Sequence, residues 1–286
     1  MVRLVVFFLA VISMVSCGDR YDFSGFIFSP GDNVNCRFER SAGHIGKPMA
    51  DIVSADEYLF YVCTDVHVSE TADNLQRFMR DFRNDPLASF GLCLGDCIDV
   101  KGKMKSFAGT IQYDPLRDSY DHPLYTAVGN HDTYFSQWDE FYEYVGPSCY
   151  YFTVSGSFGK DLFICLDSAS GTFGRKQLEW LEGFLERERG HYRHVFVFTH
   201  TDFFNTDGMN LTSGNYMLDE TYFVADLFDR SDVSAVFQGH IHSRNDLWFR
   251  DVRYTVVGAL KDGTESPEYL KVKVSAEGFG YEWVLL

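Results

Sequence analysis

The stretch YLFYVCTDVH, residues 58–67, decides the class of the fold. Its first six residues are all apolar or aromatic, without the polar alternation that marks a half-exposed strand. Such a run predicts a β-strand that is buried on both faces of its sheet. Asp65 and His67 follow this strand directly. The stretch therefore predicts a strand whose carboxyl end carries polar side chains, at the edge where open α/β sheets bind ligands.

Similar apolar runs recur along the chain, at residues 90–94, 124–128, 162–166, 195–199 and 235–237. Helical patterns lie between them. Leu75, Phe78, Met79 and Phe82 are spaced along one helix face, as are Leu178, Leu181 and Leu185. This alternation of strands and helices predicts an α/β sheet with right-handed crossovers.

The pattern changes after residue 246. Residues 253–257, 269–274 and 281–285 mix apolar and polar side chains, as antiparallel strands with one face in water do. We therefore expect a second sheet in the same domain, which we place at residues 58–286. Residues 17–57 are rich in Gly, Ser and Asp and are expected to form an extended appendage or linker.

The first residues have the features of an export signal. Arg3 precedes nine apolar residues, 4–12, a run too short to span a membrane. We interpret residues 1–16 as a signal peptide. Ser16 and Cys17 at its end resemble the lipobox of bacterial lipoproteins, in which the cysteine receives a lipid. The resemblance implies an exported cell-envelope lipoprotein, facing the periplasm or in the outer membrane and anchored through Cys17; an ordinary cleaved signal is the alternative.

Composition limits the classes of function. The chain has 286 residues, of which 45% are hydrophobic and 17% aromatic, as in a globular protein with a large core. With 25 basic and 41 acidic side chains, its formal net charge is −16. Because this charge repels phosphate backbones and no Lys/Arg cluster opposes it, no nucleic-acid binding is expected. The lack of a Cys-x-x-Cys pair argues against a zinc knuckle or a thioredoxin-type site.

Polar side chains with metal-binding potential follow five of the predicted strands. They are Asp65, His67, Asp96, Asp99, Asn130, His131, His200, His240 and His242. Because the carboxyl ends of parallel strands meet at one edge, these side chains are expected to line one cleft. Imidazole, carboxylate and amide donors without thiolates suit Mn, Fe, Zn or Mg rather than a structural zinc. The donors exceed the needs of one ion, and two ions would form a clamp for displacement at phosphorus.

Glycines precede three of these groups, at positions 95, 129 and 239. Because glycine tolerates backbone conformations that other residues avoid, we expect the chain to turn sharply at all three. The next side chain would then point into the cleft.

The ordered pattern of D-x-H, G-D-x-x-D, G-N-H-D, a lone His and G-H-x-H resembles the signature of the calcineurin-like metallophosphoesterase superfamily. The resemblance covers residue 58 to the C-terminus and implies a four-layer αββα sandwich, two mixed sheets flanked by helices. It assigns Asp65, His67 and His242 to one metal ion, Asn130, His200 and His240 to a second, and Asp96 to both. His131 resembles the histidine beside the leaving group, and Asp99 the carboxylate that orients it.

The same resemblance implies a hydrolase of small phosphate esters, in which a hydroxide bridging two divalent or trivalent metal ions attacks phosphorus. A phosphomonoesterase is favoured; a phosphodiesterase and a non-catalytic surface binding lipoprotein are the alternatives. Val100 stands where protein Ser/Thr phosphatases carry Arg, and Asp99 where purple acid phosphatases carry a metal-bound Tyr. Neither of these subfamilies is therefore expected.

Overall fold

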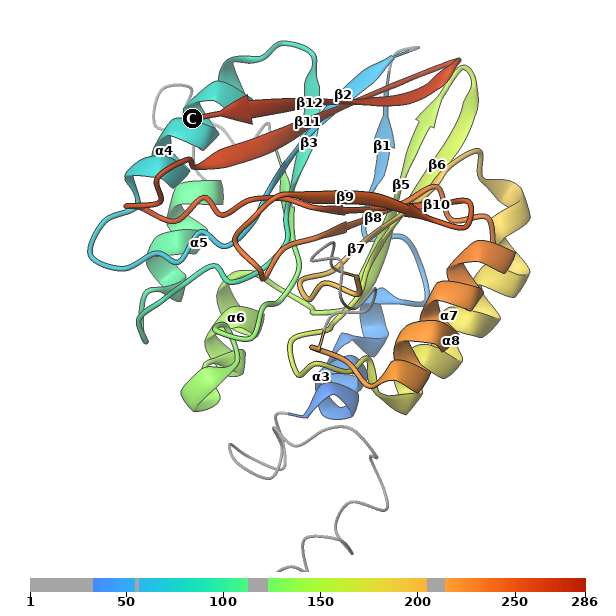
Figure 1. Ribbon diagram of the computed structural model, residues 1–286, viewed down its shortest axis with the longest axis horizontal. Coiled ribbons are helices and arrows are strands. Elements are labelled where there is room, and N and C mark those ends of the chain that lie inside the picture. The colour runs from blue at the N-terminus through green and yellow to red at the C-terminus, as the bar shows by residue number, and fades with distance from the viewer. Residues whose placement is uncertain (1–32, 55–56, 113–122, 205–213) are drawn as a thin grey trace, which may run out of the picture.

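The computed structural model describes residues 33–54, 57–112, 123–204 and 214–286. They form a mixed α/β domain with a seven-stranded and a five-stranded sheet packed face to face (Figure 1). Both sheets contain parallel and antiparallel pairs, so the predicted sandwich of two mixed sheets is confirmed. In these ranges no helix combines the length and the apolar character that a membrane crossing requires. The predicted signal peptide and Cys17 lie outside the described residues.

Each sheet mixes strands from distant parts of the chain. In spatial order, the seven-stranded sheet runs β1 (Asp51–Val53), β5 (Tyr150–Gly156), β6 (Gly159–Cys165), β7 (Val195–Phe198), β8 (Ala235–Gln238), β10 (Val252–Val256) and β9 (Asn245–Phe249). The five-stranded sheet runs β12 (Gly278–Leu285), β11 (Glu268–Ser275), β2 (Tyr58–Cys63), β3 (Ala88–Cys93) and β4 (Leu124–Thr126).

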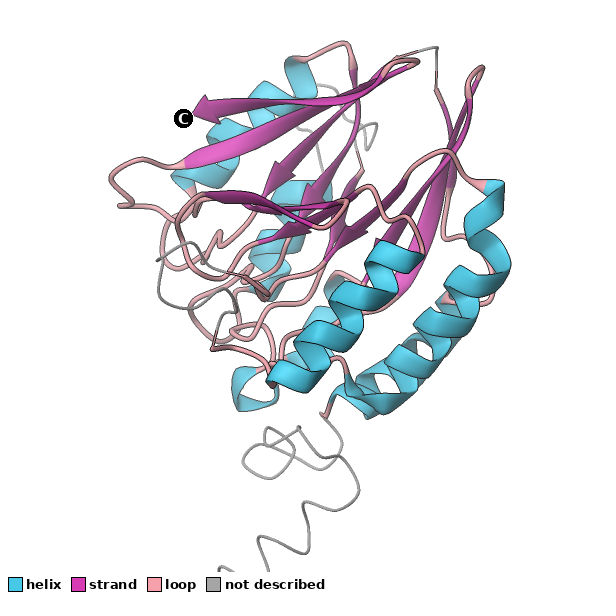
Figure 2. Ribbon diagram, turned by 45° about the vertical axis from the view of Figure 1, so that its right-hand side comes forward, coloured by secondary structure: helices cyan, strands magenta, loops and turns pink. Residues whose placement is uncertain are grey.

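Helices cover the outer face of each sheet (Figure 2). On the seven-stranded sheet these are α3 (Val34–Ser41), α7 (Gly174–Glu188) and α8 (Leu218–Arg230), and on the five-stranded sheet α4 (Asp73–Asn84), α5 (Met104–Gln112) and α6 (Trp138–Tyr144). Short 3-10 helices follow Ser41, Thr133 and Glu188: η1 (Ala42–His44), η2 (Tyr134–Ser136) and η3 (Arg189–His191). The helices predicted from Leu75–Phe82 and Leu178–Leu185 spacing are α4 and α7, and both are confirmed.

Aromatic side chains fill the space between the two sheets. The rings of Phe60 and Phe90 stack with centroids 5.2 Å apart, and those of Phe152 and Phe163 stack at 4.9 Å. Phe60 also contacts Phe163 edge to face across the two sheets. Each such ring buries a large apolar area and adds a directional contact. This aromatic layer fixes the position of one sheet on the other, and hence of the strand ends that carry the predicted site.

Strand β2 is buried on both faces, as its sequence predicted. Phe60 and Val62 face the layer between the sheets, while Tyr61 and Cys63 pack under the helices on the outer face. All four side chains are at most 1% exposed. Cys93 and Cys165, which lie in the apolar runs 90–94 and 162–166, are fully buried free thiols.

The distribution of strands differs from the sequence expectation. We expected the apolar strands to form one sheet and the C-terminal strands another, but β2–β4 and β6–β8 belong to different sheets. Strand β10 is not half-polar: it is largely buried and pairs in parallel with β8. Strands β11 and β12 are antiparallel as expected, but they extend the sheet of β2. Strands β5 and β9 were not predicted.

The N-terminal segment is also more structured than expected. We assigned residues 17–57 to an extended appendage, but α3 and β1 belong to the domain. Strand β1 is the parallel edge neighbour of β5, and α3 packs against α7. Arg37 of α3 is fully buried and forms two hydrogen bonds to Asp167, of 2.7 and 2.9 Å. The described part of this segment is therefore an integral layer of the fold.

Candidate metal centre

The predicted site residues meet where strands of both sheets end. Asp65 follows β2, and its backbone N–H donates to the carbonyl of Gly95 after β3, at 3.1 Å. On the other sheet, the N–H of Gly239 donates to the carbonyl of His200 at 2.8 Å. The two sheets are joined by the backbone N–H of His240, which donates to Oδ2 of Asp65 at 2.9 Å. Loops that are far apart in the sequence therefore form one continuous site.

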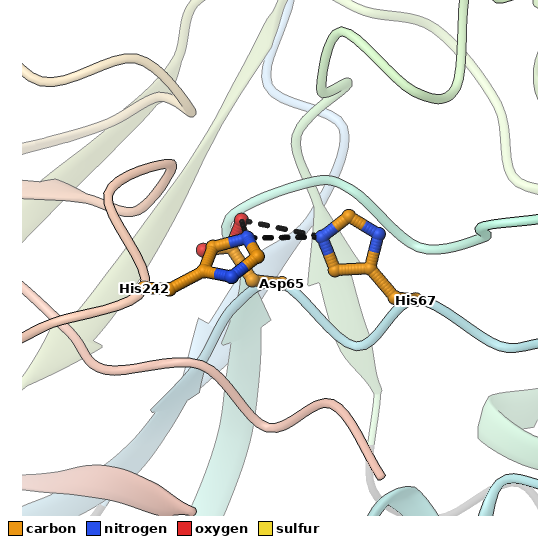
Figure 3. Close-up of side chains that lie close together, drawn as sticks. All are labelled: Asp65, His67 and His242. Atoms are coloured by element: carbon orange, nitrogen blue, oxygen red, sulfur yellow. Dashed lines mark hydrogen bonds and ion pairs between the residues drawn. The ribbon is translucent and has the colours of Figure 1, made fainter. Parts of the chain in front are cut away.

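One cluster of donors consists of Asp65, His67 and His242 (Figure 3). The Nε2 atoms of the two imidazoles are 3.1 Å apart, and Nε2 of His242 is 3.2 Å from Oδ1 of Asp65. In the described part of the chain, this buried oxygen accepts no hydrogen bond. A buried carboxylate oxygen without a hydrogen bond is costly unless a cation neutralises it. The donor set suits a metal ion bound by nitrogen and oxygen.

A second cluster lies beside the first and consists of His200, His240, Asn130 and Asp96. Nε2 of His200 is 3.2 Å from Nδ1 of His240 and 3.0 Å from Oδ1 of Asn130. Nδ1 of His200 lies 2.9 Å from the carbonyl of Leu94, so this nitrogen carries the proton. Nε2 therefore faces the cluster, and it would bind a metal ion once its own proton has left. An acceptor fixed by a hydrogen bond behind it is the arrangement of a metal-ligating histidine.

Asp96 lies between the two clusters. Its Oδ1 is 3.4 Å from Nε2 of His200, and its Oδ2 is 3.6 Å from Nε2 of His67. The N–H of His131 donates to Oδ1 at 2.8 Å and helps to fix the carboxylate. One oxygen thus faces each cluster, so this carboxylate could bridge two ions. The chemistry and the placement of the residues fit a dinuclear centre.

Backbone conformation at the centre is unusual. Positive φ angles occur at Asp65 (50°), His67 (48°), Asp96 (52°), His240 (76°) and His242 (57°). Residues other than glycine adopt this left-handed region at an energetic cost, and such strain concentrates at functional sites. The side chains at the centre are thus aimed by their own strained backbone as well as by their neighbours.

The expectation that three glycines make sharp turns holds only for Gly95, which has a φ of +96°. Gly129 and Gly239 are not in the left-handed region and serve a different purpose. A Cβ at Gly129 would lie 2.2 Å from the backbone N of Asp96, and one at Gly239 would lie 2.0 Å from Oγ1 of Thr64. These two glycines allow loops to approach each other closely.

Ionisation of the cluster residues is strongly coupled to their contacts. Burial opposes the charge on Asp65, but the imidazoles of His242 and His67 outweigh it and hold the pKa well below its usual value. Burial would lower the pKa of His200, but the charge of Asp96 raises it to about 10. Burial lowers the pKa of His240 to about 4. Asp65 is thus ionised, and in the metal-free site the protonated ring of His200 supplies positive charge beside the carboxylates. A bound metal ion would supply that charge in its place.

His131 and Asp99 lie beside the clusters. Nδ1 of His131 is 3.6 Å from Oδ1 of Asp99, a distance too long for a hydrogen bond. The same oxygen is 3.5 Å from Nδ1 of His67. His131 is partly exposed, and its ring packs edge to face against that of His67, with centroids 4.7 Å apart. Asp99 therefore faces a histidine of the first cluster as well as His131.

Three residues near the centre were not predicted. Tyr134 accepts a hydrogen bond of 2.8 Å from Nδ2 of Asn130, and thereby turns the amide oxygen toward His200. Asp132 is buried and accepts hydrogen bonds from the N–H groups of Gly129 and Cys97, so it joins two loops of the site. Lys261 donates to Oδ2 of Asp99 at 2.9 Å. Asp132 is the last residue of the G-N-H-D motif, although no role was assigned to it, whereas Tyr134 and Lys261 belong to no motif.

An α/β sandwich with two adjoining clusters of His and Asp donors, at the ends of strands from both sheets, is the arrangement expected of a metal-dependent hydrolase. A model of the calcineurin-like phosphoesterase family matches residues 58–244, and the chain belongs to this family. It is accordingly a metallophosphoesterase, a hydrolase of phosphoric esters. No curated protein sequence matches the chain.

Solved structures share the fold at low sequence identity. GAP50, titled the anchor in the inner membrane complex of Plasmodium, has a TM-score of 0.62 and 14% identity, over 80% of this chain and 84% of that one. A dimetal phosphatase from Danio rerio has a TM-score of 0.57 and 13% identity, over 80% and 98%. The purple acid phosphatase PPD1 from yellow lupin has a TM-score of 0.58 and 12% identity, over 81% and 52%. At these low identities, the comparisons show that the fold is shared.

Proposed function

We propose that this chain hydrolyses small phosphate monoesters at a dinuclear metal centre. The proposal rests on the two donor clusters that lie on either side of Asp96. One carboxylate oxygen of Asp96 faces His200, and the other faces His67. In this proposal Asp65, His67 and His242 hold one ion, Asn130, His200 and His240 hold the other, and Asp96 is shared. The donors are compatible with Mn, Fe, Zn or Mg.

Two bound ions would supply Lewis acidity, both for a water molecule and for the phosphoryl oxygens. The protein fixes the geometry. Tyr134 orients the amide of Asn130, and the carbonyl of Leu94 fixes the tautomer of His200. His131 belongs to neither proposed ligand set, and it turns Nδ1 toward Asp99. Its opposite nitrogen, Nε2, would donate a proton to the departing oxygen.

The test is turnover by the purified protein, reconstituted with each metal, on mono-, di- and pyrophosphate esters. We expect hydrolysis of monoesters, while preference for diesters would replace the proposal by a phosphodiesterase. Absence of turnover with every metal and ester would favour the surface binding lipoprotein. Against that alternative, both donor clusters and His131 are complete in this chain.

The role of His131 is tested by varying the leaving group. His131→Asn should lower turnover of alkyl phosphates by about 10² to 10⁴, the usual contribution of general acid–base catalysis. The loss should be smaller for nitrophenyl phosphate, because nitrophenolate departs without a proton. Both metal ions should remain bound. Equal losses on both esters would exclude the acid role, and loss of metal would make His131 a ligand.

We also propose that the protein is exported and anchored in the cell envelope by a lipid on Cys17. The basis is the sequence alone: a basic residue, a short apolar run and a small residue before Cys17. Cys17→Ser should release the protein from the membrane fraction, because acyl chains contribute about 0.8 kcal/mol per buried CH₂. Cys36→Ser, in helix α3, is the matched control and should remain membrane-bound. Unchanged fractionation of Cys17→Ser would exclude the lipid anchor.

A further inference from the structure

The loop that joins β10 to β11, residues 257–267, contacts the edge of the metal centre. The N–H of Leu260 donates to the carbonyl of Thr64, immediately before Asp65, at 3.0 Å. The N–H of Val257 donates to the carbonyl of Gln238, at the end of β8, at 2.9 Å. Leu260 and Val257 are fully buried. This loop is therefore fixed to the two strands that carry Asp65 and the last histidines of the site.

The residue after Lys261 is anchored even more firmly. Asp262 accepts hydrogen bonds from Oγ1 of Thr71 at 2.5 Å, from the N–H of Asp73 at 2.9 Å and from the N–H of Asn74 at 2.8 Å. The side-chain amide of Asn74, through Nδ2, in turn donates to the backbone carbonyl of Lys261 at 3.0 Å. Lys261 thus lies between two immobilised neighbours. Its ammonium group loses less conformational freedom on pairing than that of a lysine on a free loop.

From this fixed position, Lys261 forms an ion pair with Asp99, a carboxylate of the site. Its Nζ is 2.9 Å from Oδ2 of Asp99. The other oxygen, Oδ1, faces Nδ1 of His67 at 3.5 Å and Nδ1 of His131 at 3.6 Å. A carboxylate that is held at one oxygen cannot rotate without losing that contact. The lysine therefore determines which way Asp99 turns toward the two histidines.

Two other cations close by have different partners. Arg244 pairs with both oxygens of Glu268 and stacks on the ring of Trp283, with its Cζ 4.1 Å from the ring centroid. Lys103, in the loop after Asp99, pairs with Glu70 at 3.3 Å. Neither ion pair includes a carboxylate of the site.

We propose that Lys261 is a positioning residue, which holds the charge of Asp99 beside Nδ1 of His131. Asp99 then orients the protonated ring of His131 by electrostatic attraction, for proton donation from Nε2 to the leaving group. This inference rests on the proposed phosphate-ester hydrolysis and extends it to a residue beyond the matched family segment, residues 58–244. It makes the β10–β11 loop part of the machinery for leaving-group departure.

The experiment compares Lys261→Gln, Lys261→Arg, Asp99→Asn and the double variant Lys261→Gln/Asp99→Asn. Lys261→Gln should lower kcat on an alkyl phosphate by about fivefold, the factor expected for a partly exposed ion pair. On nitrophenyl phosphate the change should be below about twofold, because little proton donation is needed. Lys261→Arg should restore turnover of the alkyl ester. The double variant should be no slower than Asp99→Asn alone, since both changes interrupt the same path.

A matched control and a second readout accompany the kinetics. Lys103→Gln removes the same charge from a neighbouring ion pair and should leave kcat on both esters unchanged. In the metal-free protein, the side-chain NMR resonances of His131 and His67 should move in Lys261→Gln and stay in place in Lys103→Gln. This readout needs no turnover, so it decides the positioning role even if the wild type hydrolyses no ester.

Specific results would overturn the inference. Lys261→Gln could instead lower kcat/KM equally on both esters through a higher KM, with an effect that adds to that of Asp99→Asn. This result would mean that Lys261 contacts the substrate phosphate directly. Wild-type kinetics and unmoved histidine resonances in Lys261→Gln would mean that the ion pair is incidental. Inactivity of the wild type would instead contradict the proposed hydrolysis.

Discussion

Gly239 lies at the point where the two sheets meet the metal centre. A Cβ at this position would be 2.0 Å from Oγ1 of Thr64 and 2.8 Å from Oδ2 of Asp65. Both atoms belong to the two residues that follow β2, and Thr64 itself donates to Oδ2 of Asp65 at 2.8 Å. A methyl group here can only be accommodated if the side chain of Thr64 and the carboxylate of Asp65 both move. The need for a glycine is thus linked by direct contact to the position of the Asp65 carboxylate.

We predict that Gly239→Ala weakens metal binding by about 10- to 100-fold, as displacement of the groups that orient a ligand does. Metal titration followed by calorimetry measures the change. Gly109→Ala is the control, because Gly109 lies in helix α5 and a Cβ there meets no atom within 4 Å. That variant should bind metal normally and gain up to about 1 kcal/mol of stability. Normal metal affinity in Gly239→Ala would contradict the close contact with Asp65.

At the residue scale, the sequence predicted which side chains would lie together in the candidate metal centre, because each stands in a loop that follows a strand. Such loops leave little freedom, so a motif such as D-x-H or G-H-x-H specifies where its side chains lie. Lys261 and Tyr134 reach the site through contacts made in three dimensions. Lys261 depends on the anchoring of a loop at α4, and Tyr134 on the turn after Asn130. No local pattern encodes either contact.

At the scale of elements, helix α4 obtains its N-terminal cap from another part of the chain. Its own N-cap residue, Ala72, has no side-chain acceptor. Asp262 fills this role, because it accepts hydrogen bonds from the N–H groups of Asp73 and Asn74 and from Thr71. A carboxylate at a helix N-terminus satisfies free N–H groups and interacts favourably with the helix dipole. The cap thus couples α4 to the loop of Lys261.

We predict that Asp262→Asn lowers the free energy of unfolding by about 1 kcal/mol at pH 7. Burial opposes ionisation of Asp262, but its hydrogen bonds outweigh this and lower its pKa. A lowered folded-state pKa gives stability that is present above the unfolded pKa and lost as the pH falls through the folded value. The difference between wild type and variant should therefore shrink below about pH 4, near the pKa of an unfolded Asp. Urea unfolding at several pH values measures it, and a constant difference would contradict the charged cap.

Individual elements were predicted better than their arrangement. The strong patterns of β2, α4 and α7 are local, because they depend on which faces of one segment are buried. Assignment of strands to sheets is not local: β2 and β7 have similar apolar runs but lie in different sheets. Strand β10 appeared half-polar because Arg253 interrupts it, although this side chain pairs with Asp246 on the neighbouring strand. Such pairings become visible only when the partner strand is known.

At the scale of the whole molecule, the domain extends beyond the segment that carries the family motifs. The family match begins at residue 58, whereas α3 and β1 complete the seven-stranded side of the sandwich. Helix α3 was not predicted because three of the five side chains on its buried face are polar: Asn35, Arg37 and Ser41. The positive charge of Arg37 is neutralised by the carboxylate of Asp167, which is 130 positions away in the sequence. Neither residue indicates burial by itself.

The Arg37–Asp167 pair gives the final prediction. Both side chains are fully buried, and Arg37 also donates to Oγ of Ser170 at 3.0 Å. Removal of one partner from a buried ion pair leaves an uncompensated charge and costs about 3 to 5 kcal/mol. Arg37→Met should therefore destabilise the whole domain by about this amount in urea unfolding, with one cooperative transition, because α3 is part of the same folding unit.

Lys176→Met is the matched control for Arg37→Met. Lys176 of α7 pairs with Glu39 of α3, so it joins the same two helices, but this pair is exposed. Its removal should cost less than about 1 kcal/mol, the usual limit for surface ion pairs. If Arg37→Met lowers the free energy of unfolding as little as Lys176→Met does, α3 packs on the domain without stabilising it, and the domain begins near residue 58. A large, cooperative loss in Arg37→Met alone means that folding of the metal centre depends on a helix outside the family motifs.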